Sequence, residues 1–412
     1  MNLPKKETTE KLTDRALNLF EYCVYAALIG AACGFAGTYL GKAISYVSSL
    51  RSANPWIMWC MPLAGLVIIK LYRLAGVYES LGTNRILTSL RDKDEGLSIK
   101  VAPLIFVSTV LTHLTGGSAG RESAALQLGA SLADFIGRHL RLSHEDMRVI
   151  TMCGMSAGFT ALFGTPLAAT VFALEILANK IRYAALLPVF MSAVSAKLFC
   201  NIFGAEAESY SINVLSEISF ISILKVCALG ILAAFVSILM CIVLDETHEL
   251  YSKYLGNPYI RIFAGGVIVA VLTYFAGPSV YAGAGGHIIE KAVHGEAPMF
   301  AFVIKLILTA LTLGCGFKGG EIVPTLFVGA TFGCTVGNLI GLDPGFAAAV
   351  CMISVFAGNT NCPLAALALA VELFGGGGIA YFAIAVFLSY TLSGHYSLYS
   401  TQKLMKSRFS ID

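Results

Sequence analysis

Charged side chains are scarce in this chain, and their scarcity excludes whole classes of protein. Only 13% of the 412 residues are charged, whereas 57% are hydrophobic, and an ordinary soluble domain carries about 25% charge. The mean hydropathy is +0.76. The polar surface is too small for a soluble enzyme, a nucleic-acid binder or a disordered chain. The composition predicts a polytopic protein of the lipid bilayer with no nucleic-acid partner.

Metal-binding and targeting patterns are also missing. The 11 cysteines include no Cys-x-x-Cys pair and no Cys/His cluster, and most lie in apolar runs, where cysteine acts as a small hydrophobe. We therefore expect no metal site and no cofactor. The N-terminus lacks a cleavage-site pattern, so residues 1–16 are interpreted as a cytoplasmic tail rather than a signal peptide.

Uninterrupted spanning segments are few. A transmembrane helix needs about 20 apolar residues, and several apolar runs are shorter than this or are cut by Gly or Pro. Half-helices that end inside the membrane explain such runs, provided that their free backbone groups are buried in protein or line a cavity. The 41 glycines suit close packing between helices of this kind.

The chain repeats itself. PLAATVFALE (166–175) matches PLAALALAVE (363–372), and upstream of each segment Gly-rich sequence leads into a glutamate, in GSAGRE (117–122) and FKGGE (317–321). Ordered matches at a nearly constant offset indicate an internal duplication, which is typical of secondary transporters and related channels. We expect an all-α fold with broken helices, divided into a first membrane repeat, a polar connector, a second repeat and a short basic tail without an appended soluble domain (17–204, 205–218, 219–400 and 401–412).

The first Gly-rich segment is the strongest chemical signal. Gly116, Gly117 and Gly120 lead into a helix expected to begin near Arg121–Glu122. A helix start offers free N–H groups and a positive dipole end to an anion. A carboxylate within apolar sequence is costly and points to function, so Glu122 is predicted to occupy the anion site and to leave it when protonated. The structural alternative is a glutamate that caps its helix or pairs with Arg121.

The second Gly-rich segment, GFKGGEIVP (316–324), has the same arrangement. Glu321 follows two glycines, and Pro324 fits the first turn of a helix expected to run to about residue 341. The N–H groups of Ile322 and Val323 are predicted to face the same ion, and Glu321 to be a second proton-linked carboxylate. The alternative is a loop charge beside Lys318.

These motifs together resemble the CLC family of chloride channels and proton-coupled anion antiporters. The matching segments occur in the family's order over nearly the whole chain, namely GRESAALQLG (120–129), MSAGFTALFGTPLAATVFALE (155–175), GAGGHIIEKAV (283–293), GGEIVP (319–324) and LYS (398–400). The resemblance implies a homodimer in which each subunit is an inverted-topology repeat with its own pore. It also implies that Glu122 is the gating glutamate and that the Tyr399 hydroxyl touches the anion. Without the resemblance, such a tyrosine is more often an interface anchor.

Departures from the family pattern point to its fluoride/proton antiporter subclass. Leu81 stands where chloride-transporting members have a serine ligand, Ile176 where exchangers have an inner proton-transfer glutamate, and Ser123 where the second Gly of Gly-Arg-Glu-Gly is usual. The fluoride subclass also lacks that serine and that glutamate. It differs from this chain in carrying Asn or Met at the place of Leu81 and, in some members, Thr at the place of Val323.

The sequence therefore predicts a transporter rather than an enzyme: a proton-coupled exporter of fluoride in a microbial inner membrane, with both termini cytoplasmic. The alternative is a chloride-selective exchanger or an anion channel of the same family. The residues expected to handle protons are Glu122 and Glu321, and those expected to bind the anion are Leu81, Gly82, Gly120, Arg121, Ile322, Val323 and Tyr399.

Three further features have mainly structural interpretations. Glu175 and Glu372 close equivalent apolar stretches and are expected at helix ends, facing water or loop backbone, and Lys305 is expected to have a structural partner if it lies deep. Gly-x-Ser-x-Gly around Ser118 also fits the nucleophile elbow of a serine hydrolase, with His113 or His287 as the base. That motif belongs between a strand and a helix, and no strand is evident there.

Overall fold

The computed structural model describes the backbone of residues 5–77, 82–91, 96–177, 183–205, 210–212 and 219–402. Within these residues the only β pairing is an isolated bridge, so the predicted all-α fold is confirmed. The first half contains α1 (Lys5–Ala53), η1 (Pro55–Cys60), α2 (Met61–Leu74), α3 (Thr83–Arg91), α4 (Val101–Leu114), α5 (Glu122–His139), α6 (His144–Phe163), α7 (Pro166–Glu175), η2 (Tyr183–Ala185) and α8 (Leu186–Ile202). The second half contains α9 (Phe220–Tyr254), α10 (Pro258–Ala276), α11 (Pro278–Tyr281), α12 (Gly286–Val293), α13 (Ala301–Gly314), α14 (Ile322–Ile340), α15 (Pro344–Thr360), α16 (Pro363–Phe374) and α17 (Ile379–Leu392).

Broken helices are present as the sequence predicted. Helices α3, α7, α12 and α16 have 9, 10, 8 and 12 residues, so at about 1.5 Å per residue each covers roughly half of a ~30 Å hydrocarbon layer. Five helical segments among the described residues are long and apolar enough to cross a membrane: Leu19–Ala53, Pro55–Leu74, Phe220–Tyr254, Pro258–Ala276 and Ile322–Ile340.

In both halves the same types of residue separate a long helix from the short helix that follows it. Helix α6 ends at Gly164 (φ 71°), and α7 begins two residues later at Pro166. Helix α15 ends at Asn361 (φ 56°), and α16 begins two residues later at Pro363. In both places a left-handed residue stops the helix and a proline with fixed φ starts the next one. Two continuous apolar runs of the sequence are thus each split into two helices.

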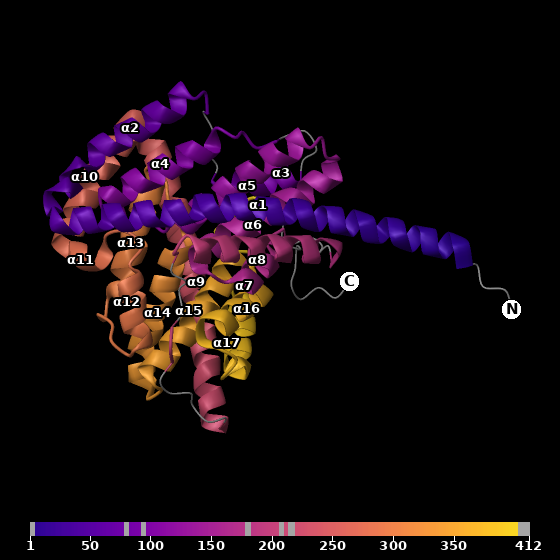
Figure 1. The fold of residues 1–412 in the computed structure, drawn as a ribbon. Helices are drawn as coiled ribbons and strands as arrows, with labels where there is room; N and C mark the ends of the chain where they lie inside the picture. The colour runs from indigo at the N-terminus through magenta and orange to yellow at the C-terminus, as the bar shows by residue number, and fades with distance from the viewer. Residues whose placement is uncertain are drawn as a thin grey trace.

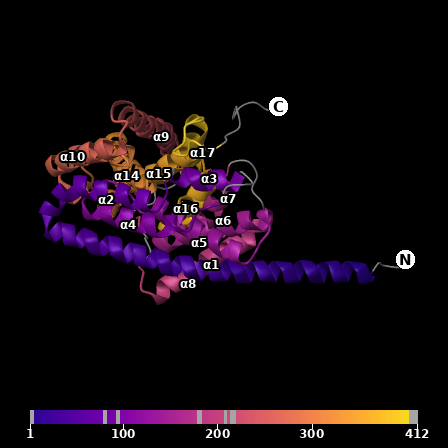
Figure 2. The same ribbon diagram turned by 90° about the horizontal axis from the view of Figure 1, so that it is seen from above.

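Equivalent helices also make equivalent contacts. Helix α1 packs on α8, α6 and α4, and its counterpart α9 packs on α17, α15 and α13. Figures 1 and 2 show the first half, in indigo to magenta, lying against the second half, in orange to yellow. Helix α1 continues through residue 16 without a break, and between α8 and α9 the structure describes residue 205 and residues 210–212 of the expected connector.

The buried core is continuous across the junction of the halves. Phe159 and Phe172 of the first half lie in one cluster with Phe346 and Phe356 of the second, and the ring centroids of Phe172 and Phe356 are 6.0 Å apart. Two repeats that share one core hold any site between them in a fixed geometry.

Candidate functional site

The N-termini of α5 and α14 meet at the isolated bridge. The Gly120 N–H donates to the Gly320 carbonyl at 2.6 Å, and the Gly320 N–H donates to the Gly120 carbonyl at 2.8 Å. A Cβ atom on Gly120 would lie 2.3 Å from Glu122 Oε2, and one on Gly320 would lie 2.9 Å from the Ser123 backbone nitrogen. A side chain at residue 320 would therefore press on fixed backbone, and one at residue 120 would displace the Glu122 carboxylate. The bridge brings two helix starts, each with free N–H groups and a positive dipole end, to one place.

Glu122 is the first residue of α5, and it is 1% exposed. Its Oε2 accepts a hydrogen bond from the Arg121 N–H at 2.9 Å, and its Oε1 lies 3.9 Å from Arg121 Nε. The capping and pairing contacts of the structural alternative are thus present. They are compatible with function, because a carboxylate that bends back onto a helix start lies where an exogenous anion would bind.

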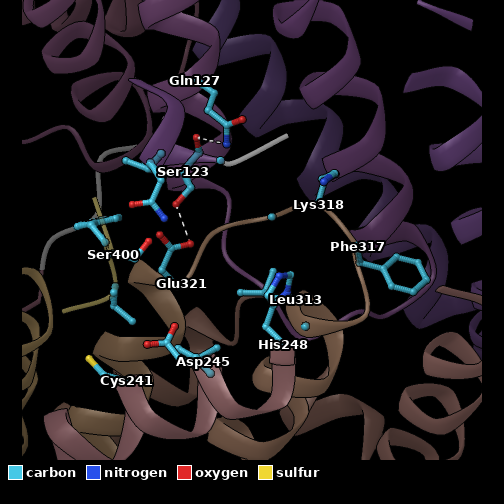
Figure 3. Close-up of a pocket in the computed structure, with 18 of the residues that line it drawn as sticks. Ser123, Gln127, Cys241, Asp245, His248, Leu313, Phe317, Lys318, Glu321 and Ser400 are labelled. Atoms are coloured by element: carbon cyan, nitrogen blue, oxygen red, sulfur yellow. Dashed lines mark hydrogen bonds between the residues drawn. The ribbon is translucent and has the colours of Figure 1, made fainter. Parts of the chain in front are cut away.

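Glu321 is the N-cap residue of α14 and lies beside the first turn of α5. Its Oε2 accepts a hydrogen bond from Ser123 Oγ at 3.0 Å (Figure 3). Because Ser123 directly follows Glu122, the fold brings both predicted carboxylates to one helix turn. Among the described residues no salt bridge joins Glu321 to Lys318, whose Nζ lies over the Tyr72 ring, 5.2 Å from its centroid.

A cavity of about 330 Å³ opens next to Glu321. Its walls come from both halves: the start of α3, the first turns of α5, the C-terminal half of α9, the loop before α14 and the segment after α17 (Figure 3). The polar lining residues are Thr83, Asn84, Ser123, Gln127, Asp245, His248, Lys318, Glu321, Tyr399 and Ser400. The cavity thus carries both acidic and basic groups close to the meeting point of the helices.

Tyr399 lines this cavity on a segment that is fixed by a buried polar network. The residue is 1% exposed, and its hydroxyl has no hydrogen-bond partner among the described residues. The neighbouring Leu398 N–H donates to the Asn359 carbonyl at 2.9 Å, and Gln402 Nε2 donates to the carbonyls of Ile176 and Thr360, both at 3.1 Å. A buried donor without a partner, on a fixed backbone, is suited to an anion ligand.

The other predicted anion residues lie at the start of α14, on the cavity wall, or outside the described residues. Ile322 and Val323 begin α14 and are 0% and 3% exposed. Gly82 lines the cavity with φ 59°, a left-handed conformation that favours glycine. Leu81 lies outside the described residues.

Ile176 is fully buried just after α7, and it presents only its carbonyl to Gln402. An aliphatic side chain cannot carry a proton, so any proton path through this chain must use other groups. Asp245 and His248 supply titratable groups on the cavity wall, although they belong to none of the predicted site motifs. They lie three residues apart on α9, where neighbours at this spacing share a helix face, and this spacing in DETHEL (245–250) was the available signal.

Glu175 and Glu372 each cap the start of a helix in the other repeat. Glu372 accepts hydrogen bonds from the N–H groups of Leu167 and Ala168 at the start of α7, at 2.9 and 2.8 Å. Glu175 accepts from the N–H groups at the start of α16, at 3.1 and 2.8 Å. Each carboxylate meets the positive end of the other repeat's half-helix. Both carboxylates lie at helix ends as expected, but the backbone that they face is the start of a helix in the opposite repeat rather than a loop.

Lys305 is fully buried on α13, and its partners are backbone carbonyls. Its Nζ donates to the carbonyls of Tyr281 at 3.2 Å and Gly283 at 2.5 Å, and it lies 5.2 Å from the centroid of the Phe327 ring. The Gly283 N–H in turn donates to the Gly117 carbonyl at 3.2 Å. Lys305 therefore supports, through one backbone segment, the loop that leads into Glu122.

Ser118 lies between helices α4 and α5. Its Oγ is 3.0 Å from Thr309 Oγ1, and its N–H donates to Thr312 Oγ1 at 3.2 Å. His113 instead places Nδ1 2.9 Å from the Thr109 carbonyl. The strand, the helix and the adjacent base of a nucleophile elbow do not meet at this serine. Across the described part of the chain, no group of three His, Cys, Asp or Glu side chains has the geometry of a metal site.

Sequence comparison gives a clear family match. The family model described as "Voltage gated chloride channel" matches residues 64–394. The chain is 33% identical over 395 residues to a chloride/fluoride channel protein of Pseudomonas syringae, with 94% of this chain and 87% of that protein covered. It is 28% identical to a putative chloride channel protein, ClcB-like, of Ralstonia nicotianae, with 79% and 80% covered.

Structural comparison agrees. The crystal structure of a CLC-type fluoride/proton antiporter superposes with a TM-score of 0.91 at 30% identity, covering 94% of this chain and 99% of that one. A slow cyanobacterial chloride/proton antiporter superposes with a TM-score of 0.80 at 19% identity, covering 90% and 94%. The second likeness, at its low identity, shows the fold alone.

Proposed function

Because this chain belongs to the CLC family of voltage-gated chloride channels and related transporters, we propose that it is a proton-coupled fluoride exporter. The observation that carries the proposal is the buried Glu122 carboxylate at the meeting point of two helix starts, with Glu321 one hydrogen bond from the next residue. The 33% identical relative is named for chloride and fluoride, and the superposed structure with a TM-score of 0.91 is titled a fluoride/proton antiporter.

The Glu122 carboxylate and the transported anion occupy the same site in turn. When ionised, its carboxylate accepts the N–H of Arg121 and fills the positive end of α5. When protonated, it loses most of that attraction and leaves, so that fluoride takes the same N–H groups. One site thus holds either the carboxylate or the anion, and each exchange of the two is tied to a proton. Inward protons then drive fluoride outward, which expels the ion that enters cells as neutral HF and ionises inside.

The cavity beside Glu321 is the proton's route on one side of the site. Ile176 offers no titratable group, whereas the cavity wall carries Glu321, Asp245 and His248. A proton that enters through the cavity reaches Glu321 first and Glu122 second, because Ser123 bridges to Glu321 from the first turn of α5. Glu321 is therefore a second proton-handling residue.

The proposal extends to assembly and location. The chain forms a homodimer, each subunit with its own path, and it lies in the inner membrane of a microbe with both termini cytoplasmic. The scarcity of charge and the five segments able to cross a membrane support the membrane location.

The test is paired anion efflux from liposomes with a simultaneous pH readout. Purified protein is reconstituted at equal density in vesicles loaded with fluoride or chloride. We expect fast fluoride efflux, slow chloride efflux and uphill proton uptake driven by the fluoride gradient. Comparable rates for both anions would identify a chloride-type exchanger, and anion movement without proton movement would identify a channel.

A further inference from the structure

Two residues that line the cavity carry buried hydroxyl groups without partners. Thr83, the first residue of α3, is 3% exposed and Tyr399 is 1% exposed, and both residues line the cavity. Among the described residues neither Thr83 Oγ1 nor the Tyr399 hydroxyl has a hydrogen-bond partner. A buried hydroxyl without a partner leaves its desolvation uncompensated, and of the unpartnered hydroxyls among the described residues these are the two whose residues line the cavity. Two of them on one cavity indicate an occupant that accepts hydrogen bonds.

The two hydroxyls are carried by segments that are tied together. Thr401 Oγ1 donates to Asn84 Oδ1 at 2.9 Å, the Thr401 N–H donates to the same oxygen at 3.3 Å, and Arg91 donates to the Thr401 carbonyl. These contacts connect the first and last turns of α3 to the segment that bears Tyr399. The spacing of the two donors is therefore fixed by the fold, as a preorganised ligand site requires.

Among the predicted anion positions, Tyr399 is the one residue whose side chain carries a hydroxyl. Leu81 and Val323 are aliphatic, and so is Ile322. Ser123 already donates to Glu321. Thr83 lies only two residues beyond Leu81, at a helix start whose N–H groups also favour an anion.

We propose that the Thr83 hydroxyl, paired with the Tyr399 hydroxyl, is a direct ligand of the transported anion and replaces the hydroxyl that Leu81 lacks. The ligand class is a small, hard monovalent anion, so the inference rests on the proposed function and adds a selectivity residue to it. Fluoride is smaller than chloride and carries the same charge, so it approaches a hydroxyl donor more closely. The electrostatic attraction grows as this separation falls. Loss of the Thr83 hydroxyl should therefore weaken the binding of fluoride more than the binding of chloride.

The experiment compares Thr83→Val, which keeps the shape and removes the hydroxyl, with Thr83→Ser, which keeps a hydroxyl. Thr273→Val is the matched control, because Thr273 on α10 is 1% exposed, has no hydroxyl partner within the described residues and does not line the cavity. Each protein is measured for fluoride and chloride binding by calorimetry and for KM and maximal efflux rate in liposomes.

We expect Thr83→Val to weaken fluoride binding and raise the fluoride KM by about tenfold or more, since hydrogen bonds to charged groups are strong. Chloride should change less, and Thr83→Ser and Thr273→Val should stay near wild type. Unchanged fluoride affinity in Thr83→Val, or an equal loss in Thr273→Val, would overturn the inference.

Two further arms keep the test decisive. Size-exclusion profiles and thermal melts identify a misfolded Thr83→Val protein, in which case Thr83→Ala takes its place in the same measurements. If wild type moves no fluoride, the proposed function fails, yet the binding measurement still decides whether Thr83 holds an anion. If wild type transports fluoride and Thr83→Val has the same fluoride affinity and KM, the assignment of Thr83 as a ligand is refuted and the proposed function stands.

Discussion

Replacing Glu122 by glutamine tests the central step of the exchange. The amide has nearly the same shape as the carboxylic acid but cannot titrate, so the alternation between an ionised, bound side chain and a protonated, displaced one is lost. We expect no uphill proton movement driven by a fluoride gradient in Glu122→Gln. Fluoride movement itself continues, because the helix starts at the Gly120–Gly320 bridge remain.

The size of a second effect follows from the contacts of the carboxylate. The charged hydrogen bond from the Arg121 N–H at 2.9 Å becomes a neutral one, which loses about half of ~2 kcal/mol. Loss of the negative charge at the start of α5 removes about 1 kcal/mol more. The side chain therefore competes less with the ion by about 2 kcal/mol, and fluoride should bind about thirtyfold more tightly to Glu122→Gln than to wild type.

Calorimetry on purified protein measures the affinity, and reconstituted vesicles with a pH dye measure the coupling. Glu290→Gln is the matched control, since Glu290 is an exposed glutamate on α12 away from the bridge. It should leave both quantities unchanged. Coupled transport at the wild-type rate and ratio in Glu122→Gln would remove Glu122 from the mechanism, and an unchanged fluoride affinity would show that its carboxylate does not occupy the anion site.

Four further substitutions test the remaining assignments. Glu321→Gln should slow fluoride-coupled proton uptake, by less than Glu122→Gln does, and a normal rate and ratio in the pH assay would make Glu321 a structural charge. Leu81→Ser should raise chloride efflux more than fluoride efflux, because it restores a hydroxyl suited to the larger anion, and an unchanged rate ratio would move the cause of selectivity to Ile322 and Val323. Glu175→Gln and Glu372→Gln should each lower the free energy of unfolding by about 1–3 kcal/mol through weaker helix caps, while the proton-to-fluoride ratio in the vesicle assay stays constant; a changed ratio would give them a role in transport.

The sequence sufficed for those parts of the site that depend on local rules. Gly-rich sequence followed by a glutamate predicted the starts of α5 and α14 within a residue, because helix starts are governed by nearby glycine, proline and acidic residues. The broken helices were predictable from the lengths of the apolar runs. The same rules place Glu122 and Glu321 on corresponding turns of the two repeats.

Contacts between distant segments could not be predicted in this way. The Asn84–Thr401 hydrogen bonds join residues more than 300 positions apart, and only the fold shows that they hold the start of α3 against the segment that bears Tyr399. Asp245 and His248 also reach the cavity through the packing of α9 rather than through a motif. Lys305 was expected to have a partner if it lay deep, and its partners are backbone carbonyls. Because every residue type has a backbone carbonyl, the sequence gives no signal of these partners.

The exchange of elements between the repeats explains why the site needs both halves. Glu175 caps the other half's α16 and Glu372 caps α7, while the Gly120–Gly320 bridge joins the two helix starts that we propose bind the ion. Neither repeat alone supplies both helix starts, because α5 and α14 contribute one each. A charge that leaves this place exposes positive helix ends from both halves at once, and burial makes that exposure costly. In the proposed mechanism, the Glu122 side chain that leaves on protonation must therefore be replaced by an anion, and this requirement ties the movement of fluoride to the movement of a proton.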